Sequence, residues 1–212
     1  MTKGVTSLVG ESPSLDPDVR LMLQVREGDE TSFGILVQKH RNAVVHFLYR
    51  MVQEQAVAEE LAQEVFFRVY RSRESYEATA KFTTWMFRIA THLALNWLRD
   101  EKRERAQERL DEPAWGGKDG GDGLPLRQVA DRQPTTEQNM VHAARLQEVR
   151  EAVAALPDKQ RAAVLMHKYE EMEYSQIATV LECSESAIKS LLFRAYETLR
   201  RKLGHMAPRE AQ

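Results

Sequence analysis

The spacing of apolar residues constrains the fold of this chain more than any other feature. Apolar side chains recur at intervals of three and four, and no segment shows the strict alternation of a half-buried strand. An α-helix turns once in about 3.6 residues, so this spacing gathers apolar side chains on one face. The segment that follows Asp29 is typical, with Phe33, Leu36, Val37, Val44, Phe47, Leu48 and Met51. The pattern predicts an all-α protein.

Capping residues divide the first half of the chain into helices. Asp16-Pro17 predicts a first helix that stops at Gly28, and Asp29 caps a second, long helix. Further helices are predicted from about 57 to 71 and from about 83 to 105. The residues between them, 72–82, form a predicted polar loop.

Glycine and proline concentrate in residues 107–136, among charged residues, and this composition cannot bury a core. The segment therefore predicts a flexible linker between two small helical domains. The complete division is a flexible tail 1–15, a first domain 16–106, the linker 107–136, a second domain 137–206 and a tail 207–212.

Composition excludes several classes of protein. The 30 basic and 32 acidic residues give a net charge of −2, so any nucleic-acid binding must come from local segregation of charge. The start of the chain lacks the pattern of a secretion signal, and no stretch is apolar enough to span a membrane, so a cytoplasmic protein without membrane insertion is expected.

No catalytic or metal-binding motif is found. The histidines are scattered, so no metal site and no cofactor are expected, and the chain is predicted not to be an enzyme. Cys183 is the single cysteine, and a small buried residue is favoured there over a nucleophile.

The segment 174–203 predicts a helix-turn-helix. Ser184 caps its second helix, and Ile188, Leu192 and Ala195 face inward. In such a motif the outward side chains at the start of the second helix reach base edges in the major groove; here these are Glu185, Ser186, Lys189, Ser190 and Arg194. Arg200, Arg201 and Lys202 suit contacts with phosphates. Taken alone, this basic helix could equally be an ordinary solvated face.

Two further helices carry distinctive outer faces. The run AVAEELAQEVFFRVYRS places Val57, Leu61, Val65 and Val69 inward and Glu59, Glu60, Gln63, Glu64 and Arg68 outward. In the run KFTTWMFRIATHLALNWLRDEKRER, Trp85 and Trp97 are predicted to belong to the core. Phe82 stands where the polar loop meets this helix, whose polar side is basic.

These motifs together resemble the extracytoplasmic-function sigma factors of bacterial RNA polymerase, within the sigma-70 family. The run LPDKQRAAVLMHKYEEMEYSQIATVLECSESAIKSLLFRAYETLRRKL is similar to their promoter-binding domain, and AEELAQEVF is similar to their polymerase-binding helix. The chain departs from the family at Glu171 and Glu182, where glycine is frequent, and at Leu191, where arginine is frequent. The resemblance implies that residues 137–206 read the minus-35 element.

The resemblance also assigns roles within the first domain. The outer carboxylates at 59–64 would meet the clamp of the largest polymerase subunit. The loop 75–82 would receive a flipped base, and the helix after it would hold the melted minus-10 strand. The residues expected at this DNA are Lys81, Phe82, Thr83, Arg88, His92, Asn96, Arg99, Lys102 and Arg103. For His92, a histidine without a binding role is an equally good interpretation.

The partners implied by the resemblance are core RNA polymerase, through its clamp and flap, and promoter DNA, both duplex and single-stranded. An anti-sigma factor, often membrane-bound, is also expected, and it could hold the protein at the inner membrane. Two other classes stay open on the residues alone. A stand-alone regulator would bind duplex DNA without polymerase, and a helical metal-dependent hydrolase would need clustered acidic residues or histidines on facing helices.

Overall fold

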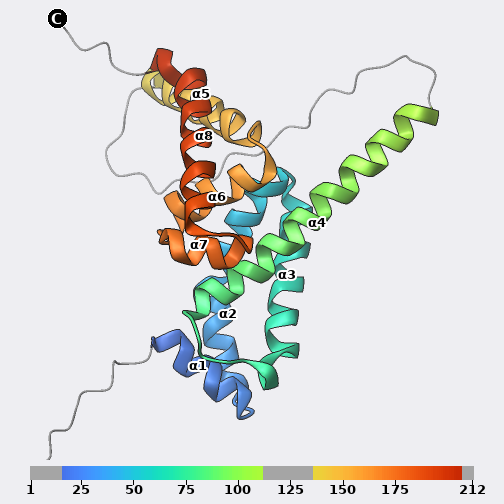
Figure 1. The fold of residues 1–212 in the computed structure, drawn as a ribbon, viewed down its shortest axis with the longest axis vertical. Coiled ribbons are helices and arrows are strands. Elements are labelled where there is room, and N and C mark those ends of the chain that lie inside the picture. Colours follow the sequence, from blue (N-terminus) through green and yellow to red (C-terminus); the bar gives the residue numbers. More distant parts are fainter. Residues whose placement is uncertain (1–15, 112–135, 207–212) are drawn as a thin grey trace, which may run out of the picture.

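The computed structural model describes residues 16–111 and 136–206, and within them the regular structure is entirely helical (Figure 1). The predicted fold class is confirmed. A first group of helices comprises α1 (Pro17–Arg26), α2 (Glu30–Val52), α3 (Gln55–Arg71) and α4 (Phe82–Asp111). A second group comprises α5 (Thr136–Ala154), α6 (Asp158–Tyr169), α7 (Tyr174–Leu181) and α8 (Glu185–Leu203). The expected tails and most of the expected linker lie outside the described residues.

The helix ends follow the capping residues in the sequence. Asp16 accepts a hydrogen bond from the backbone N–H of Asp18 at 2.9 Å, and Pro17 opens α1. Gly28 adopts a φ of +100°, which allows the chain to turn between α1 and α2. Asp29 caps α2 through the N–H of Thr31, and its hydrogen bond with Ser32 lowers the pKa of its carboxyl group. Short polar side chains therefore fix the entry of both helices.

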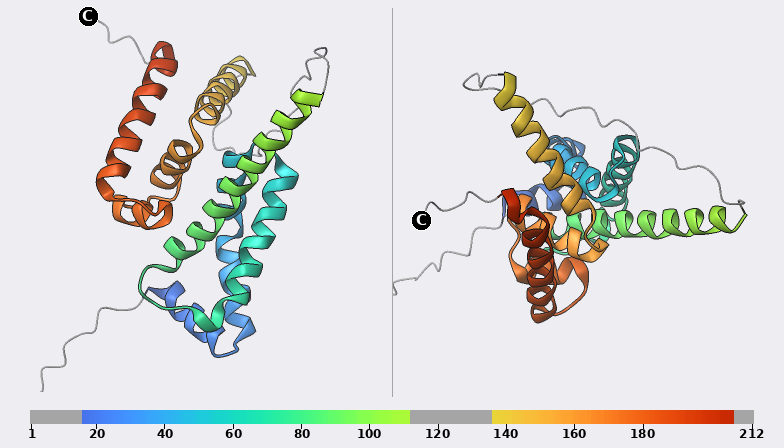
Figure 2. Two further views of the ribbon diagram at one scale, coloured as in Figure 1. Left: turned by 45° about the vertical axis from the view of Figure 1, so that its right-hand side comes forward. Right: turned by 90° about the horizontal axis from the view of Figure 1, so that it is seen from above.

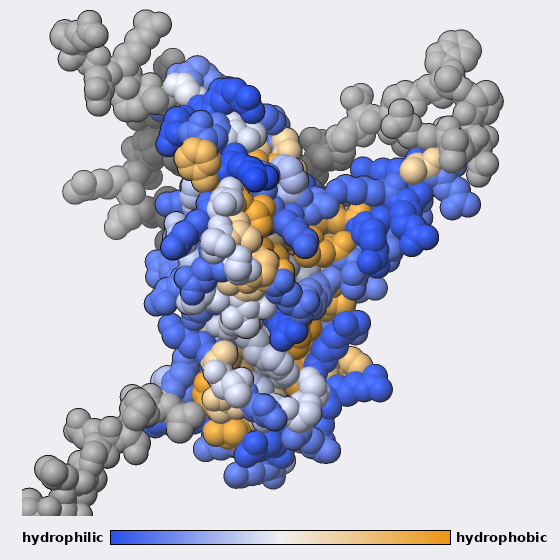
Figure 3. All heavy atoms as spheres, in the orientation of Figure 1, coloured by the Kyte–Doolittle hydropathy of each residue, from blue (hydrophilic) through white to orange (hydrophobic). Residues whose placement is uncertain are grey.

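Helix α4 is longer than expected. It continues to Asp111, so the prediction that a linker begins at Gln107 is wrong for residues 107–111. Charged side chains spaced four apart support this extension, since Arg105 pairs with Glu101 at 2.7 Å. The C-terminal half of α4 projects from the rest of the molecule, and its surface is mostly hydrophilic (Figures 1 and 3).

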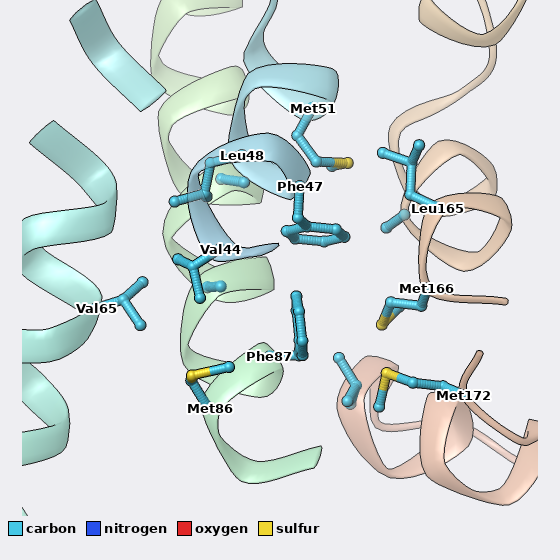
Figure 4. Packing of buried hydrophobic residues seen from close by; sticks show 14 of the residues in the cluster. Val44, Phe47, Leu48, Met51, Val65, Met86, Phe87, Leu165, Met166 and Met172 are labelled. Carbon is cyan, nitrogen blue, oxygen red and sulfur yellow. The ribbon is translucent and has the colours of Figure 1, made fainter. Parts of the chain in front are cut away.

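The core of the first group forms where α2 meets α3 and α4. Phe47 of α2 packs edge to face on Phe87 of α4, with ring centroids 5.3 Å apart, and Val65 of α3 lies on the other side of α2 (Figure 4). A buried polar contact ties α1 to α2: Asp18 accepts from Lys39 at 2.5 Å and lies 2.9 Å from the ring nitrogen of His40. Burial holds the pKa of His40 below its usual value despite the neighbouring carboxylate.

The two groups of helices share one core. Leu165 and Met166 of α6 face Phe47 and Met51 of α2 (Figure 4), and the buried apolar cluster runs without a break through both groups. Figure 2 shows the second group, in orange and red, against one side of the first. The sequence predicted two modules on a tether, but it did not predict that they dock.

A buried arginine reinforces this docking. Arg161 of α6 is only 8% exposed and donates to the carbonyl oxygens of Ala154 and Leu156 in its own group. It also donates to the carbonyl oxygen of Met51, in the last turn of α2. Carbonyl groups in the last turn of a helix lack partners within that helix. Arg161, a residue of the second group, supplies a hydrogen-bond donor to one of them at the end of α2.

Glu170 makes the stability of this arrangement depend on pH. It follows the last turn of α6, where burial raises the pKa of its carboxyl group to about 7, although Arg50 opposes the shift. The folded state thus binds a proton that the unfolded state has lost between about pH 4.5 and pH 7, so the contribution of Glu170 to stability falls as the pH rises through that range. One pKa unit corresponds to about 1.4 kcal/mol.

We predict that Glu170→Gln raises the free energy of unfolding at pH 8 by about 1–3 kcal/mol and has little effect at pH 4.5. Denaturant titrations at the two pH values measure the free energy of unfolding of the variant and the wild type. The control is Glu171→Gln, because Glu171 is the next residue and is exposed. An equal effect of Glu170→Gln at both pH values would contradict the assignment.

Candidate functional site

The outer face of α3 combines acidic and apolar side chains. Glu59, Glu60, Gln63 and Arg68 are exposed, as the helical spacing predicts, and Glu64 is half-buried. Glu64 pairs with Arg68 at 2.6 Å, and Glu59 accepts from Gln55 at 2.6 Å. Helical pairs four residues apart hold the carboxylates in position while leaving them open to solvent.

An apolar groove of about 410 Å³ lies beside these carboxylates, between α2 and α3. Phe67 stands at this groove with 57% of its surface exposed, and Ile35 of α2 is 46% exposed. Sequence reasoning missed Phe67. The signal was the Phe66-Phe67 pair, because neighbouring residues on a helix point about 100° apart and cannot both face one core. The groove is lined by Phe33, Val37, Arg41, Val45, Glu59, Ala62, Gln63, Phe66, Phe67 and Tyr70.

A row of basic and polar side chains follows the length of α4. Asn96, Arg99, Lys102 and Arg103 are exposed, Lys81 is exposed just before the helix, and Thr83 is half-buried. The structure thus presents most of the predicted minus-10 set to solvent on one helix. Such a basic track suits a nucleic-acid backbone.

Three residues of the predicted minus-10 set, all on α4, contact acidic side chains of the second group. Arg88 donates to a carboxylate oxygen of Glu182 at 2.5 Å, and His92 lies 3.8 Å from the same oxygen. Lys102 pairs with Asp158 at 2.6 Å. These contacts were not expected from the sequence, because they join residues 56 to 94 positions apart in the chain.

Phe82 corrects a prediction. Its side chain was expected at the DNA, but it is fully buried, with its ring centroid 5.5 Å from that of His40 and 6.0 Å from that of Trp85. As the first residue of α4 it turns into the core and closes the end of the bundle. Trp85 and Trp97 are partly buried against the core, as predicted.

The helix-turn-helix forms as the sequence predicts. Ser184 caps α8 by accepting from the N–H of Ala187 at 3.2 Å, and Glu173 and Gln176 form a capping box at the start of α7. Ile188, Leu192 and Ala195 are buried. The outward residues are all exposed, namely Glu185, Ser186, Lys189, Ser190, Arg194, Arg200, Arg201 and Lys202.

Two residues of this motif differ from expectation. Phe193 is 67% exposed and lies beside Lys189 and Arg194, an apolar residue that sequence reasoning did not assign. Cys183 was predicted to be buried, and this is wrong: it is exposed, because the tight turn after α7 leaves it outside the core.

Within residues 16–111 and 136–206, no three His, Cys, Asp or Glu side chains are placed to hold a metal ion. In the same part of the chain, no helix has both the length and the apolar character needed to cross a bilayer.

Two family models match this chain, one within each group of helices. Residues 36–104 match the family model of Sigma-70 region 2, and residues 146–199 match Sigma-70, region 4. The ECF RNA polymerase sigma-E factor of Haemophilus influenzae is 30% identical over 186 residues, covering 88% of this chain and 95% of that protein. The ECF RNA polymerase sigma factor SigW of Bacillus subtilis is 28% identical, covering 85% of this chain and 93% of that protein.

A solved structure has the same fold. CnrH in complex with the cytosolic domain of CnrY aligns with a TM-score of 0.64 at 18% identity, covering 91% of this chain and 100% of that one. The sequence relatives and the two family models define the class: the chain belongs to the ECF sigma factors of the sigma-70 family. It binds core RNA polymerase and directs it to promoters for the initiation of transcription.

Two phenylalanines test the assignment of core and surface. We predict that Phe82→Ala lowers the free energy of unfolding by about 3–5 kcal/mol, because it leaves a cavity where a fully buried ring was. Phe67→Ala removes the same atoms from an exposed site and is expected to change stability by less than about 0.5 kcal/mol. Chemical denaturation of both variants measures the difference, and a near-neutral Phe82→Ala would show that this ring is not part of the core.

Proposed function

We propose that three separate surfaces of this sigma factor carry its three tasks. The acidic and apolar face of α3 binds the clamp of the largest polymerase subunit, the basic row of α4 holds the melted minus-10 strand, and the start of α8 reads the minus-35 element. The observation that carries this proposal is the segregation of charge. Carboxylates lie on the outside of α3, and cations lie along α4 and α8 in a chain whose net charge is −2.

Charge and apolar contact have different roles on α3. Opposite charges on partner surfaces accelerate encounter and set orientation more than they add affinity. Exposed aromatic side chains beside a groove supply the desolvated area that holds a complex together. Phe67 and the groove between α2 and α3 are therefore proposed as the anchor, and the carboxylates as the orienting element.

On α4, the proposal assigns DNA contacts to exposed residues. Lys81, Arg99 and Arg103 are exposed cations, and Asn96 can donate to and accept from a base edge. Phe82 takes no part through its side chain because that side chain is buried. The loop before α4 is proposed to receive a flipped base, which its backbone and its exposed polar residues would contact.

On α8, outward side chains of the first three turns are proposed to enter the major groove. Lys189 and Arg194 are exposed and able to donate to guanine. Phe193 lies between them on the surface and can contact a thymine methyl group. The later cations of α8 are proposed to hold the phosphate backbone.

The wider setting is also proposed. Sigma factors in general are not enzymes, and nucleotide chemistry is assigned to the polymerase. An anti-sigma factor is proposed to control this chain, by analogy with the sigma factor RpoE of Bartonella quintana, which was solved with the anti-sigma factor NepR. A cytoplasmic location fits a partner of the polymerase, and an anti-sigma factor bound to the inner membrane could retain the chain there.

Charge reversal tests the polymerase surface. We predict that Glu60→Lys with Glu64→Lys weakens binding to purified core polymerase at least tenfold at low salt, because it replaces attraction by repulsion. Helical content, measured by circular dichroism, should stay unchanged. Glu27→Lys with Glu30→Lys makes the same charge change on exposed residues that do not lie on α3 and should leave binding intact. Wild-type assembly of the α3 variant with core polymerase would refute this interface.

Alanine substitution tests the helix-turn-helix surface. We predict that Lys189→Ala with Arg194→Ala reduces holoenzyme protection of the upstream promoter element by about tenfold or more, because each good base contact contributes about 1–3 kcal/mol. Thr179→Ala serves as control, since Thr179 is exposed on α7 and carries no charge. An unaltered footprint for the double variant would show that another face of the motif enters the groove.

A further inference from the structure

Helix α7 of the second group lies against the N-terminal half of α4. Gln176 of α7 donates to the hydroxyl of Thr84 at 3.4 Å, and Glu182 at the end of α7 reaches Arg88 at 2.5 Å. His92, one turn further along α4, is 3.8 Å from the same oxygen of Glu182. The face of α4 that carries Arg88 and His92 is thus occupied by the second group.

Glu182 holds this position in a strained backbone conformation. Its φ is +53°, in the left-handed region where glycine is favoured and a side chain is disfavoured. A residue kept in such a conformation is a reason to ask what its side chain does. The side chain of Glu182 places a carboxylate on the guanidinium of Arg88.

Glu171 offers a comparison within the same group of helices. It has a φ of +51°, close to that of Glu182, and it is also exposed. No hydrogen bond or ion pair joins Glu171 to the described part of the chain. The two glutamates thus share backbone conformation and charge, and they differ in the contact with α4.

We propose that Glu182 is an autoinhibitory contact, whose carboxylate takes the place of a DNA phosphate on Arg88 and His92 while the two groups of helices are docked. The inference rests on the proposed role of α4 in binding the minus-10 strand. A carboxylate and a phosphate both accept hydrogen bonds from a guanidinium, so the two compete for Arg88. The hydrogen bond from Arg88 lowers the pKa of Glu182, which keeps the carboxylate ionised and able to compete.

A second acidic residue acts in the same way further along the helix. Asp158, at the start of α6, pairs with Lys102 at 2.6 Å. Each contact joins a cation of the predicted DNA surface to an acid of the second group. DNA that binds along α4 must therefore displace the second group from both ends of the contact.

The size of the effect follows from the exposure of the pair. Arg88 is 46% exposed and Glu182 54% exposed at their side chains, and such ion pairs contribute little individually. The apolar core between the groups supplies most of the docking. Because DNA binds only the open fraction, weakening the docked state raises apparent affinity by the same factor, about two- to fivefold for a pair of this kind.

The test compares Glu182→Gly with Glu171→Gly in the full chain without polymerase. Both variants remove one negative charge and relieve one left-handed residue, so general electrostatic and folding effects are matched. The probe is a fluorescent single-stranded DNA of random sequence, and binding is measured by anisotropy. Glu182→Gly is expected to bind about two- to fivefold more tightly than the wild type, and Glu171→Gly is expected to bind as the wild type does. Equal gains in both variants would overturn the proposal, because charge alone would then explain them.

A distance measurement separates this proposal from the proposed role of α4. Dyes on Arg71→Cys and Glu197→Cys, in a Cys183→Ser background, report the separation of the two groups by energy transfer. Lower transfer in Glu182→Gly than in Glu171→Gly supports the contact, and unchanged transfer overturns it. Lower transfer without tighter DNA binding would show that Glu182 holds the two groups together, but it would contradict the assignment of α4 to DNA.

Discussion

The apolar contact between α2 and α4 supports the rest of the molecule. Phe47 and Phe87 meet edge to face at its centre, and α3 packs on one side of α2 while α6 packs on the other. Burial of large apolar side chains is the dominant favourable term in folding, so this contact fixes the directions of the surrounding helices. Once α3 and α4 are fixed, their outer faces are fixed as well, and these are the faces proposed to meet polymerase and DNA.

The same core also joins the two groups of helices, and this docking affects the proposed DNA surface of α4. Leu165 and Met166 pack on α2, and Arg161 satisfies the end of that helix from the other group. Docking through these residues brings acidic side chains of the second group onto cations of α4. If α4 and α8 bind two separated promoter elements as proposed, the two groups must separate on the promoter, because the docked arrangement covers part of the proposed DNA surface of α4.

Local features of the fold could be predicted from the sequence because each depends on neighbours within a few residues. Asp29 and Ser184 cap helices where short polar residues precede an apolar pattern, and the outer carboxylates of α3 follow from helical spacing alone. The helix-turn-helix and the exposed face of α8 were predicted for the same reason. Here local chemistry and the final structure agree.

Other features depend on residues far apart in the chain, and they could not be predicted. The burial of Phe82 depends on His40 in α2, and the docking of the two groups depends on contacts between Met51 and Arg161. Periodicity places a residue on a face of a helix, but it does not say what covers that face. Phe67 and Phe193, by contrast, are exposed apolar residues that the sequence can reveal. Once the neighbouring residues of the helix are placed on its inner face, these two must lie on the outer face.

The most direct test of the account is run-off transcription with purified core polymerase and a library of promoter fragments. Addition of this chain is predicted to give initiation from a restricted set of fragments that share two separated sequence elements, with no product from core polymerase alone. Equal transcription of all fragments, or no transcript in the presence of the chain, would contradict the claim that it selects and opens promoters.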